Sequence, residues 1–485
     1  MSRFAVVLHV LSVVVLVLAV TMLLPLGVSL YLSDGAGHAY DEAILVTALA
    51  GGLTWLATRR ARRELQIRDG FLLVVLVWTV LPAFATLPLM IYLPKLSFTD
   101  AYFETVAAIT TTGSTVLSGL DALPTSINVW RTLLQWIGGM GIIVLAVAIL
   151  PLLGVGGSQL YKAETPGPMK DAKLTPRITE TAKGLWLVYF AITVVCVIAY
   201  RWAGMSWLDA LIHAFSTMSL GGFSNHDASF GYFNSPAIEI VAIVFMLIAG
   251  INFGTHFLAW RKLTLGPYRA DAEAGLFIGV MVMSCIGIAW FLLGNQVYPD
   301  IWTALRNAAF NVVSIGTTTG YASADFNQWP IFAPLWMLFI GSFATCAGST
   351  GGGIKMIRAQ ILFKQVFREM LRILHPKVYR PIKLAGQPVE NNVIFAVLAF
   401  AFVYMSSVSL LTLVLAVSGL DALSSFSAVV ACINNIGPGL NLVGPATTYA
   451  ALNDFQISVL TFTMVLGRLE LFTLLVVLTP AFWRK

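Results

Sequence analysis

Long apolar stretches separated by short polar segments recur along the whole chain. A helix needs about 20 mostly apolar residues to cross the hydrocarbon of a bilayer. The first stretch, Phe4 to Leu32, has no Asp, Glu, Lys or Arg and is too long for the apolar part of a cleaved signal peptide, so we predict a retained helix. The pattern predicts ten membrane-spanning helices, near 4–32, 41–58, 70–93, 129–153, 184–203, 236–260, 274–294, 331–363 with an interruption, 393–417 and 457–482.

Composition supports this membrane assignment. Hydrophobic residues make up 58% of the 485 residues and charged residues only 11%, which lies outside the range of ordinary globular proteins. Lys and Arg in short loops stay on the cytoplasmic side, and a cytoplasmic N-terminus places most of the 29 Lys and Arg residues there. The net charge of +6 is therefore a mark of topology, and nucleic-acid binding is the weaker interpretation. The basic segments lie at 3, 59–68, 162–183, 261–269, 355–383 and 484–485.

Four segments between the predicted spans are too short to cross a membrane and resemble one another. In three of them, Asp or Asn followed by Ala precedes a glycine by the same interval, and we expect these residues to cap short helices: Asp100 before Gly113, Asp209 before Gly222, and Asn307 before Gly320. In the fourth, Phe426 stands at that interval from Gly439; Ser424, Ser425 and Ser427 are alternative caps, and Asp421 lies farther upstream. Repeats of this kind predict fused units of the form helix, half-membrane hairpin, helix.

The physics of one unit favours a cation. A helix of about ten residues is roughly 15 Å long and ends at mid-membrane, where its C-terminus carries about half a negative charge. The following string can aim carbonyl oxygens at an axis, because glycine permits unusual dihedral angles. A single copy is better explained as an ordinary turn, but four copies favour a shared ion pathway. The predicted pathway residues are Thr111, Thr112, Gly113, Ser114, Leu220, Gly221, Gly222, Phe223, Thr318, Thr319, Gly320, Tyr321, Gly437, Pro438, Gly439 and Leu440.

A glycine-rich segment interrupts the span that follows the third hairpin. Three consecutive glycines, residues 351–353, cannot sustain a helix cheaply, so the helix should break there. A phosphate-binding loop is the weaker interpretation because Ile354 separates the last glycine from Lys355 and Met356 replaces the required Ser or Thr. The predicted loop contains Ala347, Gly348, Ser349, Thr350, Gly351, Gly352 and Gly353.

Arg468 lies within the last predicted span. A buried arginine is costly in a bilayer unless it faces a cavity or a partner. We predict that it faces the pathway, with an ion pair to Glu470 or to another buried acid as the alternative. Polar residues near the spans are expected mainly to pack or to bond between helices, and four cysteines without a metal-binding or redox spacing are expected to be packing residues. These polar residues are Glu104, His213, Asn252, His256 and Arg306, while Asn434 and Asn435 are expected to support the fourth string.

The four strings, "TTTGST", "STMSLGGFS", "SIGTTTGY" and "NNIGPGL", resemble the filter segments of the Trk/Ktr/HKT superfamily of potassium transporters, most closely its TrkH-type members. The resemblance covers essentially the whole chain. It implies an all-α polytopic membrane protein with four fused pore units in pseudo-fourfold arrangement and two extra N-terminal helices. The corresponding units are 1–69 for the extension and 70–160, 161–269, 270–383 and 384–485 for the pore repeats.

The resemblance also implies function and partners. It predicts potassium uptake across the bacterial inner membrane, with both termini cytoplasmic, no organic cofactor, and the glycine-rich loop and Arg468 as the gate. A homodimer and a cytosolic TrkA-type regulatory subunit with nucleotide-binding RCK domains are the expected partners. Each string has one aligned glycine and no Tyr-Gly pair, so rubidium should pass with potassium and some sodium should leak. Sodium-preferring plant relatives carry Ser at the first filter glycine, so Gly113 indicates potassium.

Two other classes of protein are weaker interpretations. A secondary cation-coupled solute transporter would have inverted repeats around a midplane site, whereas these copies all run in one sense. An intramembrane enzyme would need a catalytic motif, and the sequence contains no HExxH pair and no nucleophile elbow. We therefore expect a transport protein that is not an enzyme.

Overall fold

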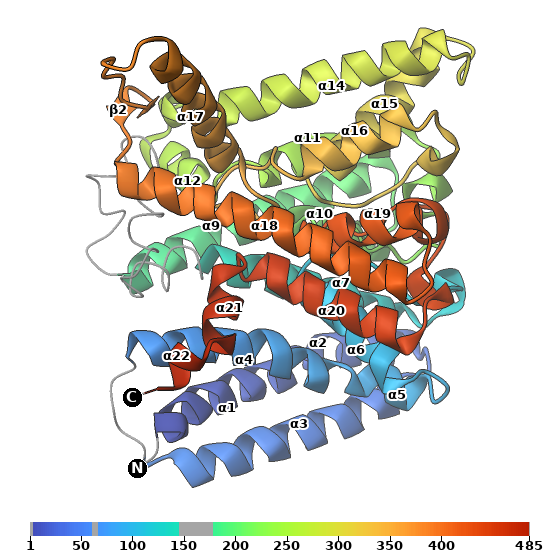
Figure 1. Ribbon diagram of the computed structural model, residues 1–485. Helices are drawn as coiled ribbons and strands as arrows, with labels where there is room; N and C mark the ends of the chain where they lie inside the picture. Colours follow the sequence, from blue (N-terminus) through green and yellow to red (C-terminus); the bar gives the residue numbers. More distant parts are fainter. Residues whose placement is uncertain (1–2, 61–65, 145–177, 485) are drawn as a thin grey trace.

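The computed structural model describes residues 3–60, 66–144 and 178–484, and these fold almost entirely as helices (Figure 1). Helices α1 (Arg3–Thr21), α2 (Leu23–Leu32) and α3 (Gly37–Thr58) form the N-terminal extension on one flank of the molecule. The two ends of the chain lie at the same side, together with α17 (Met356–Leu374) and the small β-hairpin. This arrangement agrees with the all-α membrane fold that the sequence predicts.

Four units follow the extension, each containing one helix of 12 to 16 residues that leads into a non-helical segment. The first contains α4 (Ile67–Ala85), α5 (Leu87–Tyr92), α6 (Phe98–Ile109), η1 (Leu120–Ala122) and α7 (Thr125–Val144). The second contains α9 (Ile178–Ala203), α10 (Trp207–Ser219), η3 (Ser229–Tyr232), α11 (Pro236–Ala249), α12 (Phe253–Lys262) and α13 (Gly266–Ala270). The boundary predicted between them, at 160 and 161, lies outside the described residues, as does much of the basic segment 162–183.

The third unit contains α14 (Ala274–Gly294), α15 (Ile301–Gly316), η4 (Phe326–Gln328), α16 (Phe332–Gly341) and α17, followed by strands β1 (Lys383–Leu384) and β2 (Gln387–Pro388). The two strands pair antiparallel, with Leu384 opposite Gln387. The fourth unit contains α18 (Asn391–Val417), α19 (Ala422–Ile433), η5 (Asn441–Val443), η6 (Tyr449–Ala451), α20 (Asp454–Arg468), α21 (Phe472–Leu478) and α22 (Pro480–Trp483).

Within the described ranges, five helical stretches are long and apolar enough to cross a membrane, and two bent helix pairs raise the number to seven. The five match predicted spans: Phe4–Leu32, Arg68–Tyr92, Ala182–Ala203, Ala274–Gly294 and Asn391–Val417. Three further predicted spans correspond to α3, to α7, and to α16 with α17 on either side of the glycine-rich loop. The predicted continuation of α7 to residue 153 lies outside the described residues.

Two predicted spans are not continuous helices. Helices α11 and α12 meet at 92°, and α20 and α21 meet at 115°. The first bend follows from the cap at Asn252, whose side chain accepts from the Gly254 amide at 2.8 Å and so starts a new helix. The second follows from left-handed backbone at Glu470 and Leu471, with φ of 52° and 55°, which ends the hydrogen-bond ladder of α20.

The short helices begin earlier than predicted. The caps of α6 and α10 are Ser97 and Ser206, whose hydroxyls accept from the amides three residues on, so Asp100 and Asp209 lie in the first turn. Asp300, not Asn307, caps α15, which adds two turns to this helix, and Asp421 rather than a serine caps α19. A side chain caps best at the residue before the first helical turn. The prediction chose residues by their regular interval to the glycine, and these lie after the true caps.

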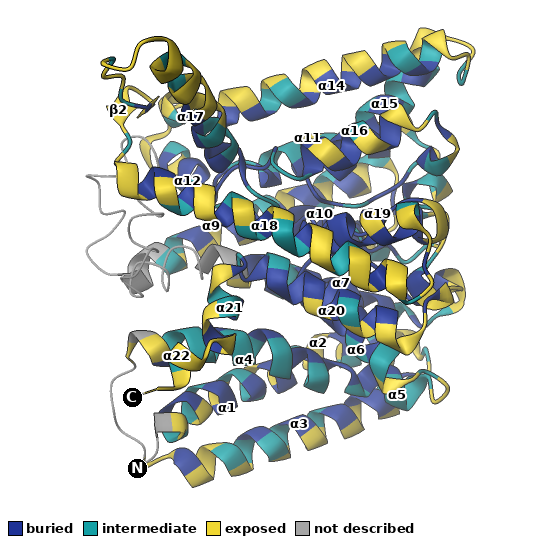
Figure 2. Ribbon diagram, in the orientation of Figure 1, coloured by how far each residue is buried: buried dark blue, intermediate teal, exposed yellow. Residues whose placement is uncertain are grey.

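The short helices occupy the centre of the molecule. Figure 2 shows α10 and α19 largely buried, whereas α3 and α14 carry exposed faces. The exposed positions on the outer helices are often large and apolar, as expected beside lipid; they include Leu53, Met283, Trp290 and Phe402. The ends of the central helices pack onto glycines, because a methyl group on Gly138 or Gly467 would lie 1.9 Å from a carbonyl oxygen of α6 or α19. The four cysteines are buried and unpaired, as predicted: Cys196, Cys285, Cys346 and Cys432.

Candidate functional site

Each central helix is followed by a string of the same backbone shape. We call residues 110–114, 219–223, 317–321 and 434–438 the four strings. In each, a left-handed residue ends the helix and a glycine with positive φ follows two residues later. The left-handed residues are Thr111, Leu220, Thr318 and Asn435, with φ of 52°, 53°, 62° and 54°, and the glycines are Gly113, Gly222, Gly320 and Gly437, with φ of 78°, 80°, 92° and 104°.

The same hydrogen bond stabilises this turn in all four strings. The amide between the two left-handed positions donates to the carbonyl five residues earlier in the helix, at 2.8 Å in every copy. This is the bond of a Schellman helix ending, which needs a left-handed residue before the donor and so explains the positive φ at the Thr, Leu and Asn positions. The donors are Thr112, Gly221, Thr319 and Ile436.

The four glycines form a closed ring. A methyl group built on Gly113 would lie 2.0 Å from the carbonyl oxygen of Gly221 in the second string. One on Gly222 would lie 2.1 Å from that of Thr319, and one on Gly320 would lie 2.1 Å from that of Ile436. The ring closes because Gly437 faces the carbonyl oxygen of Thr112 at 2.8 Å, measured from the same built position. The strings therefore meet around one axis in sequence order.

The register of the fourth string differs from the sequence alignment by two residues. Gly437, not Gly439, has the φ angle and the neighbour that define the ring. Gly439 donates its amide to the Val443 carbonyl at 2.7 Å, and Leu440 donates to Ser427 Oγ at 2.9 Å, so both lie beyond the ring. The alignment was misled because it started from Phe426, whereas the residue equivalent to Asp100 and Asp209, three residues after the helix cap, is Ser424.

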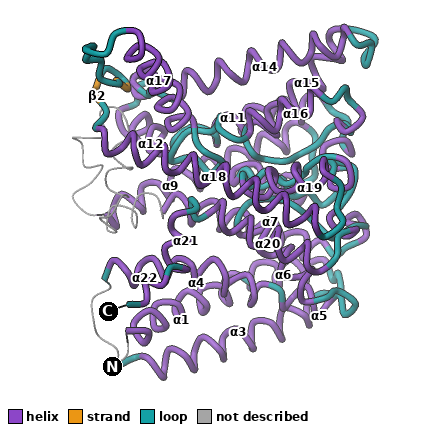
Figure 3. Tube along the Cα trace, viewed as in Figure 1, coloured by secondary structure: helices purple, strands orange, loops and turns teal. Residues whose placement is uncertain are grey.

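Most carbonyl groups of the strings have no hydrogen-bond donor among the described residues. Buried carbonyls are normally paired, so a group of unpaired ones around an axis is a place for a ligand that supplies positive charge. The carbonyls without a donor include those of Thr111, Thr112, Gly113, Leu220, Gly222, Thr318, Thr319, Gly320, Asn435 and Ile436. Figure 3 shows non-helical segments passing through the interior of the helix bundle.

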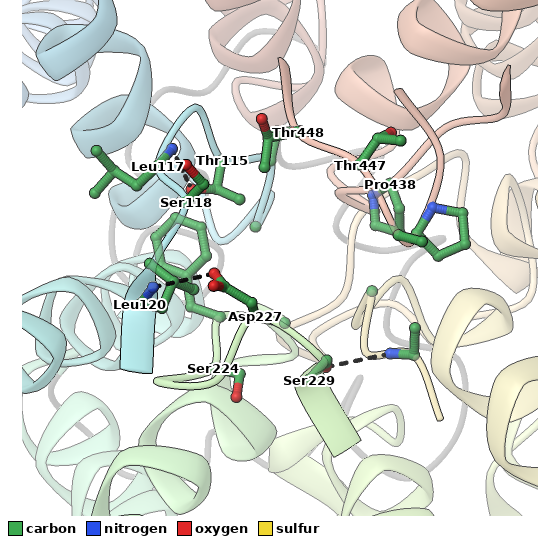
Figure 4. Close-up of a pocket in the computed structure, with 18 of the residues that line it drawn as sticks. Thr115, Leu117, Ser118, Leu120, Ser224, Asp227, Ser229, Pro438, Thr447 and Thr448 are labelled. Atoms are coloured by element: carbon green, nitrogen blue, oxygen red, sulfur yellow. Dashed lines mark hydrogen bonds between the residues drawn. The ribbon is translucent and has the colours of Figure 1, made fainter. Parts of the chain in front are cut away.

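A cavity of about 190 Å³ lies over one face of the ring. Gly113, Gly222, Gly320 and Pro438 contribute to its lining, together with loops that follow the strings. Figure 4 shows Thr115, Asp227, Pro438 and Thr447 around it, from three of the four units. Asp227 fixes the first loop by accepting from the amides of Gly119 and Leu120 at 2.9 and 3.0 Å.

A buried ion pair braces the outer ends of the first two strings. Arg131 and Glu104 lie 2.7 Å apart and are at most 1% exposed. Glu104 also accepts from the Val116 amide at 3.1 Å, and Arg131 donates to the Ser224 carbonyl at 3.2 Å. The sequence interpretation missed Arg131, although an arginine inside a predicted span was a signal for it.

The glycine-rich loop, residues 342–355, lies against the other face of the ring. Its Gly352 amide donates to Thr318 Oγ1 at 2.8 Å, and its Thr350 hydroxyl donates to the Met218 carbonyl at 3.0 Å. A methyl group on Gly352 would lie 1.9 Å from the Asn434 carbonyl oxygen. The loop thus contacts the second, third and fourth units where their central helices end.

The conformation of the loop is also stabilised by hydrogen bonds within it and by the carboxylate of Glu273. Ile354 donates its amide to the Ser342 carbonyl at 2.6 Å, and Lys355 Nζ donates to the Gly351 carbonyl. The buried carboxylate of Glu273 accepts from the amides of Ala347 and Ile357 at 3.1 and 2.9 Å. Glu273 and Lys355 were not predicted as site residues, and both lie at helix ends that the sequence pattern placed only loosely.

Arg468 joins the loop to the first string. Its guanidinium donates to Thr111 Oγ1 at 2.7 Å and to the Thr350 carbonyl at 3.1 Å. Glu470, the alternative partner, bonds instead to Arg358 at 2.7 Å. Arg468 is 5% exposed, so its charge lies beneath the ring and away from bulk water.

The family of the chain follows from comparison with known proteins. The sequence model described as TrkH, cation transport protein, matches residues 37–485. The chain belongs to the TrkH family. This family consists of transporters and not of enzymes. Among the described residues of this TrkH-family chain, no three His, Cys, Asp or Glu side chains form a group that could hold a metal ion.

Relatives in the TrkH family match over their full length. The Trk system potassium uptake protein TrkH of Salmonella typhimurium is 46% identical over 489 residues, covering all of both chains. The protein of the same name from Escherichia coli K12 is 45% identical with the same coverage. The crystal structure of the potassium transporter TrkH from Vibrio parahaemolyticus superimposes with a TM-score of 0.92 and 43% identity, again covering 100% of both chains.

A histidine joins two outer loops of this TrkH-family chain. His226 Nδ1 bonds to Asp121 in the preceding unit, and its ring stacks on Tyr232 at 3.5 Å between centroids. Partial burial by itself favours the neutral ring, but the carboxylate of Asp209, 3.6 Å from Nε2, and the hydrogen bond and charge of Asp121 outweigh it and raise the pKa of His226. The pKa of Asp121 is lowered in spite of partial burial, chiefly by its bond with His226.

The remaining polar residues mostly bond within the protein, as expected. His213 bonds to Ser224 at 3.0 Å behind the second string, and His256 bonds to Tyr268 at 2.7 Å. Arg306 forms an ion pair with Glu239 at 2.7 Å. Two asparagines lie closer to the strings: Asn434 donates to Ser342 Oγ at 3.0 Å, and Asn435 donates to Thr112 Oγ1 at 2.8 Å.

Proposed function

We propose that this protein takes up potassium across the bacterial inner membrane through the ring formed by the four strings. The single observation that carries the proposal is the closed ring of Gly113, Gly222, Gly320 and Gly437, surrounded by carbonyl groups without donors. Relatives of this length and identity are named potassium uptake proteins, which supports potassium as the cation.

The chemistry of the ring suits an alkali cation. Carbonyl oxygens replace the water that an ion loses on entering a narrow pore, and they bear no net charge that would trap it. The C-terminal ends of α6, α10, α15 and α19 all point to the strings, and each adds a partial negative charge. These partial charges would repel an anion.

We propose that the structure is closed, with residues 342–355 and Arg468 as the gate. The guanidinium supplies a fixed positive charge beneath the ring, which opposes the passage of a cation. It also bonds to the loop at the Thr350 carbonyl and to the ring at Thr111, so opening requires both to separate. Shortening the loop by removing residues 347–352 is expected to raise basal flux, and an unchanged rate would exclude the loop from gating.

The same resemblance suggests the assembly and its orientation. We propose a homodimer in which each protomer keeps its own pathway, with a cytosolic TrkA-type subunit docked on the side of the termini. The repeat boundaries 69/70, 160/161, 269/270 and 383/384 are part of this proposal. Rubidium is expected to use the pathway with potassium.

Current recording from the purified protein in planar bilayers tests the function. Opposed potassium and sodium gradients should give a reversal potential close to that of potassium, with rubidium carrying similar current. A current that does not distinguish cations from anions would contradict the proposal. Flux that saturates with an organic solute would instead favour a secondary cation-coupled solute transporter, the alternative class.

A further inference from the structure

The ring is closed, but its carbonyl groups are not equivalent. The carbonyl oxygen of Gly437 accepts two hydrogen bonds from side chains, from Ser114 Oγ at 2.9 Å and from Tyr449 Oη at 2.8 Å. A carbonyl oxygen has two lone pairs, so these two donors occupy its hydrogen-bonding capacity. Tyr449 is 2% exposed and its amide donates to the Thr115 carbonyl at 2.9 Å, which holds the hydroxyl in place.

A carbonyl of the second string also accepts a hydrogen bond from a side chain. Gln135, on α7, donates from Nε2 to the Gly221 carbonyl at 2.5 Å. Its Oε1 accepts from the Phe223 amide at 3.3 Å, so this fully buried side chain forms hydrogen bonds with the second string at two points. The equivalent carbonyls of Thr112, Thr319 and Ile436 have no such donor among the described residues.

The engaged carbonyls lie on opposite sides of the axis. Because the strings are arranged in sequence order, the second faces the fourth and the first faces the third. The first and third strings share the sequence Thr-Thr-Thr-Gly and the same internal bond between threonine hydroxyls, at 2.7 Å in both. These two strings keep their three carbonyls, at Thr111, Thr112 and Gly113 and at Thr318, Thr319 and Gly320, without a donor.

We propose that Tyr449 and Ser114 together, and Gln135 alone, are positioning residues that draw the carbonyl oxygens of Gly437 and Gly221 away from the cation and so lower the selectivity of the pathway. Three of the four equivalent carbonyls then remain for the cation at the level of Gly221, and three at the level of Gly437, so the fourfold symmetry of the ring is broken at both levels. This inference rests on the proposed function. Fewer or weaker carbonyl ligands favour potassium less strongly over the smaller sodium ion.

Removing the donors should restore the missing ligand. In the double variant Tyr449→Phe with Ser114→Ala, the Gly437 carbonyl loses both donors, and the potassium-to-sodium permeability ratio is expected to rise several-fold. Tyr449→Phe alone leaves the Ser114 hydroxyl in place and is expected to keep a ratio near that of the wild type. Gln135→Leu should raise the ratio in the same direction through Gly221. The measurement is the reversal potential of the reconstituted protein between potassium and sodium solutions.

Tyr200→Phe is the matched control. It removes a buried tyrosine hydroxyl that bonds to Thr217 Oγ1 at 2.7 Å and not to a string carbonyl, so the ratio should not change. An unchanged or lower ratio in the double variant, with potassium current still present, would overturn the inference while the proposed function stands. A wild-type protein without cation current would overturn both. Size-exclusion profile and melting temperature identify a variant that fails to fold, in which case Tyr449→Phe combined with Ser114→Gly replaces it.

Discussion

Arg468 is the charged side chain that links the two functional parts of the molecule. It is buried and bonds to Thr111 of the first string and to the backbone of Thr350 in the loop. The sequence predicted that it faces the pathway, from its depth in the last span. The identity of its partners required the structure, because they lie more than a hundred residues away in the chain.

Replacing Arg468 with Ala is expected to raise rubidium flux into proteoliposomes. A hydrogen bond to a charged group contributes about 1.5–3 kcal/mol, and about 1.4 kcal/mol changes an equilibrium tenfold, so the open fraction should increase about tenfold. Arg201→Ala is the control, since this arginine lies over the Trp207 ring, 5.6 Å from its centroid, at the end of α9. Flux that does not increase would show that Arg468 is not part of the barrier.

His226 predicts a pH dependence of stability. Its folded pKa is raised above the usual value of 6.5, so the protonated ring stabilises the fold fully below that value, and this contribution is lost as the pH rises through the folded pKa. The melting temperature of His226→Gln should therefore fall below that of the wild type at about pH 5, with a difference that shrinks towards about pH 9. His38→Gln, at an exposed position, is the control, and a pH-independent difference for His226→Gln would contradict the expectation.

The four strings are the elements in which sequence and backbone agree most closely. A positive φ is strained for any residue with a Cβ, and the structure places glycine at all four ring positions. The sequence identified the strings by their repetition and placed three of the four ring glycines correctly. It erred in the fourth because the alignment counted residues from the wrong helix start, and only the contact of Gly437 with Thr112 fixes the register.

Gly222→Ala should abolish potassium-selective current. Its added methyl group would lie 2.1 Å from the Thr319 carbonyl oxygen, and the backbone angle itself disfavours a side chain by about 1–2 kcal/mol, enough for a loss of tenfold or more. The matched control is Gly279→Ala in α14, where no atom lies within 4 Å of the added methyl group. Normal selectivity in Gly222→Ala would argue against the ring as the site of discrimination.

On the scale of the whole molecule, the charge pattern predicts a cytoplasmic side that carries most of the Lys and Arg residues. The termini, α17 and the β-hairpin lie together in the structure, in agreement with the predicted distribution of Lys and Arg (Figure 1). The bends after α11 and α20 were not predicted, because apolar composition alone does not distinguish a straight span from a pair of helices at 92° or 115°. The first bend contacts the glycine-rich loop directly, since Phe253 donates its amide to the Gly348 carbonyl at 3.0 Å.

Cysteine labelling in intact cells tests this orientation. The four native cysteines are buried and should not react with a membrane-impermeant maleimide. Cysteine introduced by Asn295→Cys, in the exposed turn after α14, should be labelled from outside. Cysteine introduced by Lys377→Cys, exposed beyond α17, should be labelled only after the membrane is opened. Labelling of Lys377→Cys but not of Asn295→Cys in intact cells would show the opposite topology.

The sequence by itself determined the membrane class, the apolar spans, the four repeated strings and the break at the glycine-rich loop, because each depends on local composition or on a backbone angle that a nearby residue permits. The tertiary structure decided the order of the strings around the axis, the register of the fourth, the partners of Arg468 and the engagement of the Gly221 and Gly437 carbonyls. These features depend on contacts between distant segments, such as Ser114 with Gly437, and no local pattern specifies which carbonyl a distant side chain will reach.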